Sequence, residues 1–186
     1  QADMVWAAKL REIKSNCVHK SFTASKLASL GFKPMGGRWV LTWKILGLDD
    51  RGVPIYTVKA RIVCKGFSDF QKLQLDVYSP TAARLSQRIL VSTAAAMRWQ
   101  IRSIDISTAF IQGQDLAEAK TDEGSQRRAA CSVPADVWEC LRELGEWAPP
   151  HGEEDGWVWW LLNALYGLGD APKLWLEEVL SFLRSL

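Results

Sequence analysis

Hydrophobic and polar positions alternate most regularly between residues 38 and 65. A strand over 38–45 is predicted because every second residue is apolar and faces the same side: Trp39, Leu41, Trp43 and Ile45. Residues 55–65 are rich in β-branched side chains and predict a second strand. Residues 48–52 between them have the polar composition of a turn. The pattern therefore predicts an antiparallel hairpin with a polar tip.

The N-terminal segment has the spacing of an amphipathic helix. Residues 5–15 place three apolar residues on one face: Trp6, Leu10 and Ile13. Lys9, Glu12 and Lys14 lie outside that face and are expected to point into solvent. Residues 23–30 allow one or two further helical turns before a stretch broken by Gly and Pro.

The remaining segments differ in how clearly they predict structure. Residues 79–97 begin with a Ser-Pro-Thr helix-start signal and keep helical spacing to their end. Residues 170–186 predict another helix, with Asp170 as its N-cap. The compact apolar run at 157–162 predicts a strand. Residues 114–156 have no clear periodicity and are expected to form an exposed, partly mobile insertion.

Asp105 ends a strand predicted over residues 99–106 and precedes a turn closed by Gly113. A carboxylate at the end of a strand is well placed to hold a divalent metal over a cleft. The alternative is a half-exposed Asp beside a turn, which is the commoner situation for any single Asp. The neighbouring motifs have to decide between the two.

The second strand of the hairpin carries a row of cations. Lys59, Arg61 and Lys65 share one face because side chains in a strand repeat every two residues. Such a row suits the binding of phosphates. A solvated strand face is the alternative, and the row by itself favours that alternative.

Composition limits the class of protein. The 186 residues suffice for one domain or two small lobes, and a net charge of +2 does not by itself indicate nucleic-acid binding. Most of the ten tryptophans are expected in the core. The four cysteines have no C-x-x-C spacing and are expected to be reduced thiols of an intracellular protein. Neither a signal peptide nor an apolar run of membrane-spanning length is found. The first residue is not Met, and the last lies inside an amphipathic pattern, so a fragment of a longer protein is expected.

Four segments form an ordered set of motifs. They read VKARIVCKGF at 58–67, YSPTAAR at 78–84, IDISTAFIQG at 104–113 and ALYGLGDAP at 164–172. These are similar to YKARLVAKGF, FSPVAR, MDVKTAFLNG and ALYGLKQAP, and the chain thereby resembles the reverse transcriptase domain of copia-type LTR retrotransposons. The resemblance extends over nearly the whole chain. It implies an α+β fold of the polymerase fingers-and-palm type, incomplete at its C-terminal side.

The resemblance implies RNA-directed DNA synthesis by two-metal nucleotidyl transfer in the complete parent protein. Asp105 would be one of three metal-binding aspartates and the catalytic residue of this stretch, with Mg²⁺ as the ion. The backbone of Ile106 would face the incoming triphosphate. Phe110 would lie under the sugar, where its ring excludes a 2′-hydroxyl and selects deoxynucleotides.

The same resemblance assigns the hairpin cations and the later turn to substrate binding. Lys59 and Arg61 become candidates for a clamp on the triphosphate, with Lys44 as a further candidate. Tyr166 and Gly167 would border the nucleotide and the template strand, and Gly167 would allow a close backbone approach.

The resemblance also implies domains and partners. Residues of about 38–98 would form the hairpin and helix of the fingers, and about 99–186 part of the palm with the insertion near 114–156. The partners would be an RNA or DNA template-primer, dNTPs, and the integrase and ribonuclease H regions of the same polyprotein, with no membrane. The expected location is intracellular, in a cytoplasmic particle and the nucleus.

The chain departs from the family in two motifs. The aromatic-x-Asp-Asp motif does not occur, and Asp49-Asp50 in the hairpin turn is no substitute, so this stretch is not expected to polymerise alone. Gly169 and Asp170 replace Lys-Gln, which is expected to remove a cation and add an anion near the template path. Two alternatives therefore stay open. One is an inactive remnant that binds nucleic acid or acts as a scaffold, and the other is an unrelated α+β interaction domain.

Overall fold

The computed structural model describes residues 1–186 as a mixed α+β fold built on one five-stranded sheet. The strand order is β1-β5-β4-β2-β3, and neighbours are antiparallel except for the parallel pair β2 and β4. The strands are β1 (Phe22–Lys26), β2 (Met35–Leu48), β3 (Pro54–Cys64), β4 (Ala130–Ser132) and β5 (Trp157–Leu161). The sheet therefore joins the first third of the chain to its last third.

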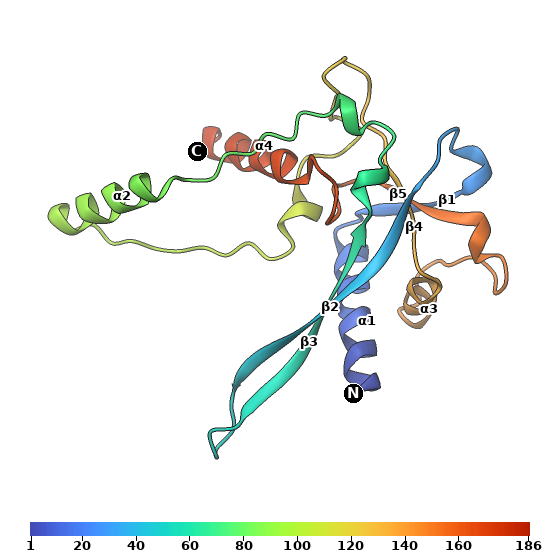
Figure 1. The fold of residues 1–186 in the computed structure, drawn as a ribbon, viewed down its shortest axis with the longest axis horizontal. Helices are drawn as coiled ribbons and strands as arrows, with labels where there is room; N and C mark the ends of the chain where they lie inside the picture. Colours follow the sequence, from blue (N-terminus) through green and yellow to red (C-terminus); the bar gives the residue numbers. More distant parts are fainter.

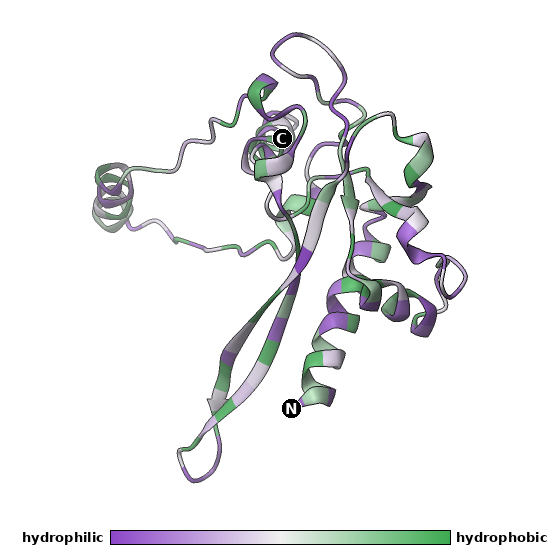
Figure 2. Cartoon of the chain, turned by 45° about the vertical axis from the view of Figure 1, so that its right-hand side comes forward, coloured by the Kyte–Doolittle hydropathy of each residue, from purple (hydrophilic) through white to green (hydrophobic).

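The predicted hairpin is confirmed as β2 and β3. The two strands pair from Gly37 opposite Cys64 to Leu48 opposite Pro54, with a bulge between Ile45 and Gly47. Burial alternates along the inner half of β3, as the sequence pattern requires. The outer half projects from the body of the molecule (Figure 1), and hydrophobic and hydrophilic residues alternate along it (Figure 2). Residues 41–56 are exposed on both faces of the hairpin.

The hydrophobic core lies between the sheet and helices α1 (Ala2–Val18) and α3 (Ala135–Glu143), and α4 (Ala171–Arg184) begins in it. Trp138 and Trp159 are its largest apolar side chains. The ring of Phe22 stacks on Trp159 at 3.7 Å between centroids. Four more tryptophans are partly buried and pack against the core clusters, namely Trp6, Trp39, Trp157 and Trp160. Most of the ten therefore contribute to the core as expected, although only two are fully buried.

Residues 114–156 are not an exposed insertion, and that prediction is wrong. β4 lies between β5 and β2, α3 packs against α1, and several residues of the segment belong to the main core, among them Leu116, Val137 and Leu141. β4 has only three residues, and α3 has nine, which is shorter than the window of about 11 to 18 residues over which a helical period is usually recognised.

Residues 99–106 form no strand, which corrects a second prediction. They lie between α2 (Arg84–Met97) and the short 3₁₀ turn Ala109–Gln112, and their apolar side chains are exposed. A strand needs a neighbour to accept and donate its backbone hydrogen bonds, and no strand of the sheet lies beside this segment.

Two boundaries also differ from those predicted. Residues 22–26 form β1 rather than helical turns because they pair with β5, and only Leu27–Ser29 makes a 3₁₀ turn. α2 begins at Arg84 and not in the Ser-Pro-Thr signal, because Ser79 Oγ donates a hydrogen bond to the carbonyl of Pro172 at 3.2 Å.

Helix α2 stands apart from the sheet on two extended connections (Figure 1). Ala94 is its only buried residue, and the apolar side chains of Leu85, Ile89 and Leu90 are exposed. None of the helices combines the length and the hydrophobicity that crossing a bilayer requires.

Candidate functional site

The end of β3 and the turn before α4 meet through their backbones. The amide of Cys64 donates a hydrogen bond to the carbonyl of Tyr166 at 2.8 Å. A β-carbon at Gly66 would overlap the carbonyl oxygen of Gly167, and one at Gly167 would overlap that of Cys64. Gly167 also has a φ of +94°, a conformation that side chains disfavour. Two motifs far apart in sequence are therefore joined where only glycine fits.

This junction brings three of the predicted site residues into one row. The guanidinium of Arg61 lies over the ring of Tyr166, 5.2 Å from its centroid. The ring of Phe110 meets the ring of Tyr166 edge to face at 5.3 Å and 64°. A cation and two aromatic rings from three motifs thus form a continuous surface.

Arg61 has an unsatisfied donor in this row. Its Nε atom is buried and has no hydrogen-bond partner. A buried donor without an acceptor is costly, and an anionic acceptor would remove that cost. The arrangement is therefore suited to an anion that approaches beside Tyr166.

A second group of residues lines a cavity of about 520 Å³ beside the hairpin. Its polar lining includes Lys44 and Lys59 from the hairpin, Arg11 and Glu12 from α1, and Thr108. Burial lowers the pKa of Lys59, and the charges of Arg61 and Lys44 lower it further. The cavity therefore holds clustered cations at the base of the hairpin.

Asp105 is exposed and lies near this group. Its charge, like that of Glu12, raises the pKa of Lys59 and so partly offsets the lowering. Ile106 is also exposed and lies in the connection rather than in a strand. The sequence thus placed both residues correctly in a motif but wrongly in a regular element.

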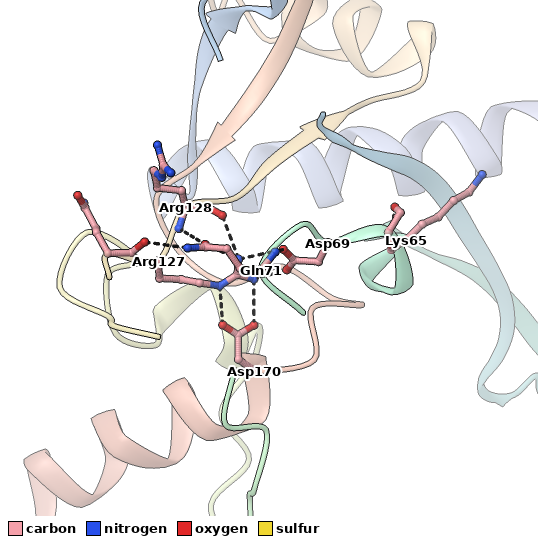
Figure 3. Close-up of polar contacts among 8 residues, drawn as sticks. Lys65, Asp69, Gln71, Arg127, Arg128 and Asp170 are labelled. Carbon is pink, nitrogen blue, oxygen red and sulfur yellow. Dashed lines mark hydrogen bonds and ion pairs between the residues drawn. The ribbon is translucent and has the colours of Figure 1, made fainter. Parts of the chain in front are cut away.

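Lys65 lies just beyond the strand that carries Lys59 and Arg61. β3 ends at Cys64, and the backbone amide of Lys65 donates to the carbonyl of Gly36 at 2.8 Å. Figure 3 shows its side chain directed away from the neighbouring polar cluster. Of the three predicted cations, only Lys59 and Arg61 therefore lie in the strand itself, and Lys65 is an exposed residue directly beyond its end.

Arg127 forms a buried ion cluster with Asp69 and Asp170 at the start of α4 (Figure 3). Its Nε donates to Asp170 Oδ2 at 2.7 Å, and its Nη2 donates to Asp69 Oδ2 at 2.5 Å. Gln71 Oε1 accepts from the backbone amide of Arg128 at 2.8 Å and from Arg127 Nη1 at 3.3 Å. The cluster ties the loop after β3, the segment before β4 and the start of α4 together.

This cluster corrects two expectations about Asp170. Its carboxylate makes no capping hydrogen bond to α4. It also adds no free anion beside the template path, because it is 4% exposed and paired with Arg127. The departure from the family at this position is therefore compensated inside the protein.

A separate cluster of possible metal ligands consists of Glu139, His151 and Glu154. Arg142 already pairs with both glutamates at 2.7 Å, and the group lies on α3 and the loop that follows it. The guanidinium occupies the place that a cation would take. This cluster therefore has no evident connection with Asp105.

Comparison with known proteins agrees with the motifs. Residues 19–120, more than half of the chain, match the family described as reverse transcriptase (RNA-dependent DNA polymerase). The chain belongs to the reverse transcriptase family. The family identification made from the four motifs is confirmed, and the reading as an unrelated interaction domain is excluded.

The similar proteins with curated names are transposon polyproteins. The retrovirus-related Pol polyprotein from transposon TNT 1-94 of Nicotiana tabacum is 29% identical over 156 residues, which are 83% of this chain and 10% of that protein. Those from transposons RE2 and RE1 of Arabidopsis thaliana are 29% and 28% identical over 153 residues, 82% of this chain and 9% of theirs. The reverse transcriptase chain thus spans about a tenth of the length of these relatives. No solved structure matches it.

Sequence reasoning missed two residues that organise the site, Arg127 and Glu12. Arg127 lies in a polar run, and nothing in that run distinguishes a buried arginine from a solvated one. Glu12 was placed outside the apolar face of its helix, whereas it faces β3 and accepts a hydrogen bond there. Lys9, placed outside likewise, pairs with Asp136 of α3.

Proposed function

We propose that this chain contributes the fingers and part of the palm of an RNA-directed DNA polymerase. Residues of about 38–98, with the hairpin and α2, correspond to the fingers, and about 99–186 to part of the palm. The curated relatives are Pol polyproteins of transposons, which supports a polyprotein origin. Integrase and ribonuclease H regions are the expected neighbours, and a template-primer and dNTPs the expected substrates. A cytoplasmic particle and the nucleus are the corresponding locations.

The main support for this proposal is that residues from three separate motifs lie next to one another in the fold. Arg61, Tyr166 and Phe110 are in contact although each comes from a different motif. Lys59 and Asp105, from two of the same motifs, are close enough for the aspartate charge to raise the pKa of the lysine. A nucleotide has a polyphosphate, a sugar and a base, and this surface offers cations and aromatic rings side by side.

The hairpin cations bind the triphosphate in this proposal. Arg61 offers the guanidinium group that lies over the Tyr166 ring to a phosphate oxygen, and Lys59 adds a second charge from the same strand. Lys44 lines the same cavity and is the third candidate. The pKa of Lys59 is lowered first by burial and then by the charges of Arg61 and Lys44, and a group of neighbouring cations of this kind attracts anions.

The aromatic pair sets the position of the sugar. Phe110 is half-buried against Tyr166, so its ring is held in place from one side. A sugar that rests on this ring has no room for a 2′-hydroxyl, and deoxynucleotides are preferred. The backbone of Ile106 faces the triphosphate, and Gly167 keeps the Tyr166 turn tight against β3.

Asp105 is the residue here that would hold Mg²⁺. Its exposed carboxylate is a hard oxygen ligand of the kind that Mg²⁺ prefers, and it supplies one ligand of a site that needs several. When bound, Mg²⁺ ions lower the pKa of the attacking hydroxyl and neutralise charge on the transferring phosphate. The Glu139 cluster does not fit this role because Arg142 pairs with its glutamates.

Nucleotide selectivity tests the proposal on the chain itself. NMR titrations with dATP and ATP in the presence of Mg²⁺ should show binding shifts at Arg61 and Tyr166, with dATP preferred. Phe110→Ala removes the ring that excludes the 2′-hydroxyl, so the preference should fall by about tenfold or to parity.

Phe67→Ala is the matched control because Phe67 is an exposed aromatic, 75% accessible, outside the Arg61–Tyr166–Phe110 row. It should leave the dATP preference unchanged. Equal affinity of the unmodified chain for dATP and ATP, with no response to Phe110→Ala, would contradict the assignment. That result is also what an inactive remnant that binds only nucleic acid predicts.

A further inference from the structure

The outer edge of β3 is covered by side chains of α1. β3 is the last strand of the sheet, and α1 packs along it. Glu12 Oε1 accepts a hydrogen bond from the backbone amide of Ile62 at 3.3 Å, and Arg11 Nη2 donates to the carbonyl of Val58 at 3.4 Å. Glu12 thus satisfies a backbone donor that an edge strand otherwise leaves to solvent.

Glu12 also stands among the cations of the hairpin. Burial raises the pKa of its carboxyl group, while the amide of Ile62 and the charges of Arg61 and Lys59 act in the opposite direction. Arg11 from α1 and Lys44 from β2 line the same cavity. Asp105 is a second acid whose charge raises the pKa of Lys59.

We propose that Glu12 is a positioning residue that anchors the edge of β3 and serves as the internal counter-charge of Lys59 and Arg61 until a polyphosphate takes its place. Ile62 lies next to Arg61 in the strand, so the hydrogen bond to Glu12 fixes the backbone that carries the guanidinium. This inference rests on the proposed binding of phosphates by Lys59 and Arg61. It adds Glu12 as the residue that keeps Arg61 in position before a phosphate binds.

Two variants distinguish the anchoring of β3 by Glu12 from its role as a counter-charge. Glu12→Gln keeps an oxygen that can accept from the Ile62 amide but removes the charge, and Glu12→Ala removes both. Glu178→Gln on α4 is the control, because Glu178 is exposed and the change removes the same charge at a distance from the hairpin.

Two measurements need no ligand. Amide hydrogen exchange at Ile62 should be about two- to tenfold faster in Glu12→Ala and unchanged in Glu12→Gln. NMR titration of Lys59 should give a lower pKa in both Glu12 variants and no change in Glu178→Gln, because Glu12 raises that pKa. An unchanged Lys59 titration, or unchanged exchange at Ile62 in Glu12→Ala, would overturn the inference.

Binding of inorganic triphosphate tests the link to function. Glu12→Gln should bind it about three- to tenfold more tightly than the unmodified chain, because a competing anion is gone. Binding that is equal in the two proteins overturns the counter-charge role. If triphosphate binds neither protein while both ligand-free readouts respond as expected, Glu12 keeps its positioning role and the proposed function fails instead.

Discussion

At the scale of single residues, the glycines of two motifs serve the packing of the backbone. A β-carbon on Gly66 would overlap the carbonyl oxygen of Gly167, and one on Gly167 would overlap the carbonyl oxygen of Cys64. This close backbone approach holds the Tyr166 ring against Arg61. Their place in the motifs is therefore explained by the junction that builds the site, before any nucleotide is considered.

Gly167→Ala should lower the free energy of unfolding by about 2–4 kcal/mol, because it adds backbone strain and overlap with the Cys64 carbonyl. Urea denaturation measures the loss. Gly169→Ala is the matched control, since a β-carbon there meets only a side-chain methyl group of Val77 at 3.3 Å. Equal losses in the two variants would contradict the role assigned to Gly167.

Arg127→Met should be strongly destabilising, by about 3–5 kcal/mol, because it leaves the carboxylates of Asp69 and Asp170 buried without a partner. Arg128→Met, a change at a neighbouring exposed arginine, should cost much less. Chemical denaturation of both variants provides the comparison. A mild effect of Arg127→Met would mean that the carboxylates find water or other donors.

The sequence names candidate site residues but does not predict the contacts between them. Asp105, Phe110 and Tyr166 are found because their neighbours form motifs. The stacking of Arg61 on Tyr166 is not predictable, since it depends on a junction between distant segments. The burial of Arg127 could not be predicted for another reason, because the local sequence around a buried arginine does not differ from that around an exposed one.

At the scale of elements, a strand could be predicted from the sequence when its partner strand lies next to it in the chain. The hairpin of β2 and β3 supplies its own partner strand, so its alternation of residues suffices to predict it. Residues 99–106 alternate too, but lack a partner, and local pattern cannot supply one. β1 was missed for the converse reason, because its partner β5 lies far along the chain.

The contact between α1 and β3 should give stability a pH dependence through Glu12. The folded protein raises the pKa of Glu12 above its usual value of 4.5, so this group stabilises the fold fully below that pH. The contribution is lost as the pH rises through the folded pKa. The unmodified chain should therefore lose stability relative to Glu12→Gln as the pH increases from about 4.

Denaturation of both proteins at a series of pH values checks this, since carboxylates common to both cancel in the difference. A constant difference between the two proteins across the series would contradict the raised pKa. Glu178→Gln serves again as the control, because it removes an exposed carboxylate of α4 that does not contact β3.

At the scale of the whole molecule, the chain is unusually open. It exposes 12255 Å² for a mass of 20.9 kDa, whereas a compact monomer of that mass exposes about 9000 Å². The outer half of the hairpin and helix α2 account for much of this surface, and both carry exposed apolar residues. Surfaces of this kind are typical of contacts with other chains or domains.

Small-angle X-ray scattering should therefore give a radius of gyration clearly above about 16 Å, the value for a compact domain of this length. The measurement should be made at low protein concentration, so that association through the exposed apolar residues does not increase the radius of gyration. A value near that of a compact domain would show that α2 folds back onto the sheet in solution.

The junction between Cys64 and Tyr166 also sets an order of events during synthesis. The two residues are about a hundred positions apart, and β1 and its partner β5 are separated by a still longer stretch of sequence. At about 5–20 residues per second, the ribosome delivers Tyr166 roughly 5–20 seconds after Cys64. The hairpin, including Lys59 and Arg61, is therefore synthesised several seconds before the Tyr166 turn that packs against it.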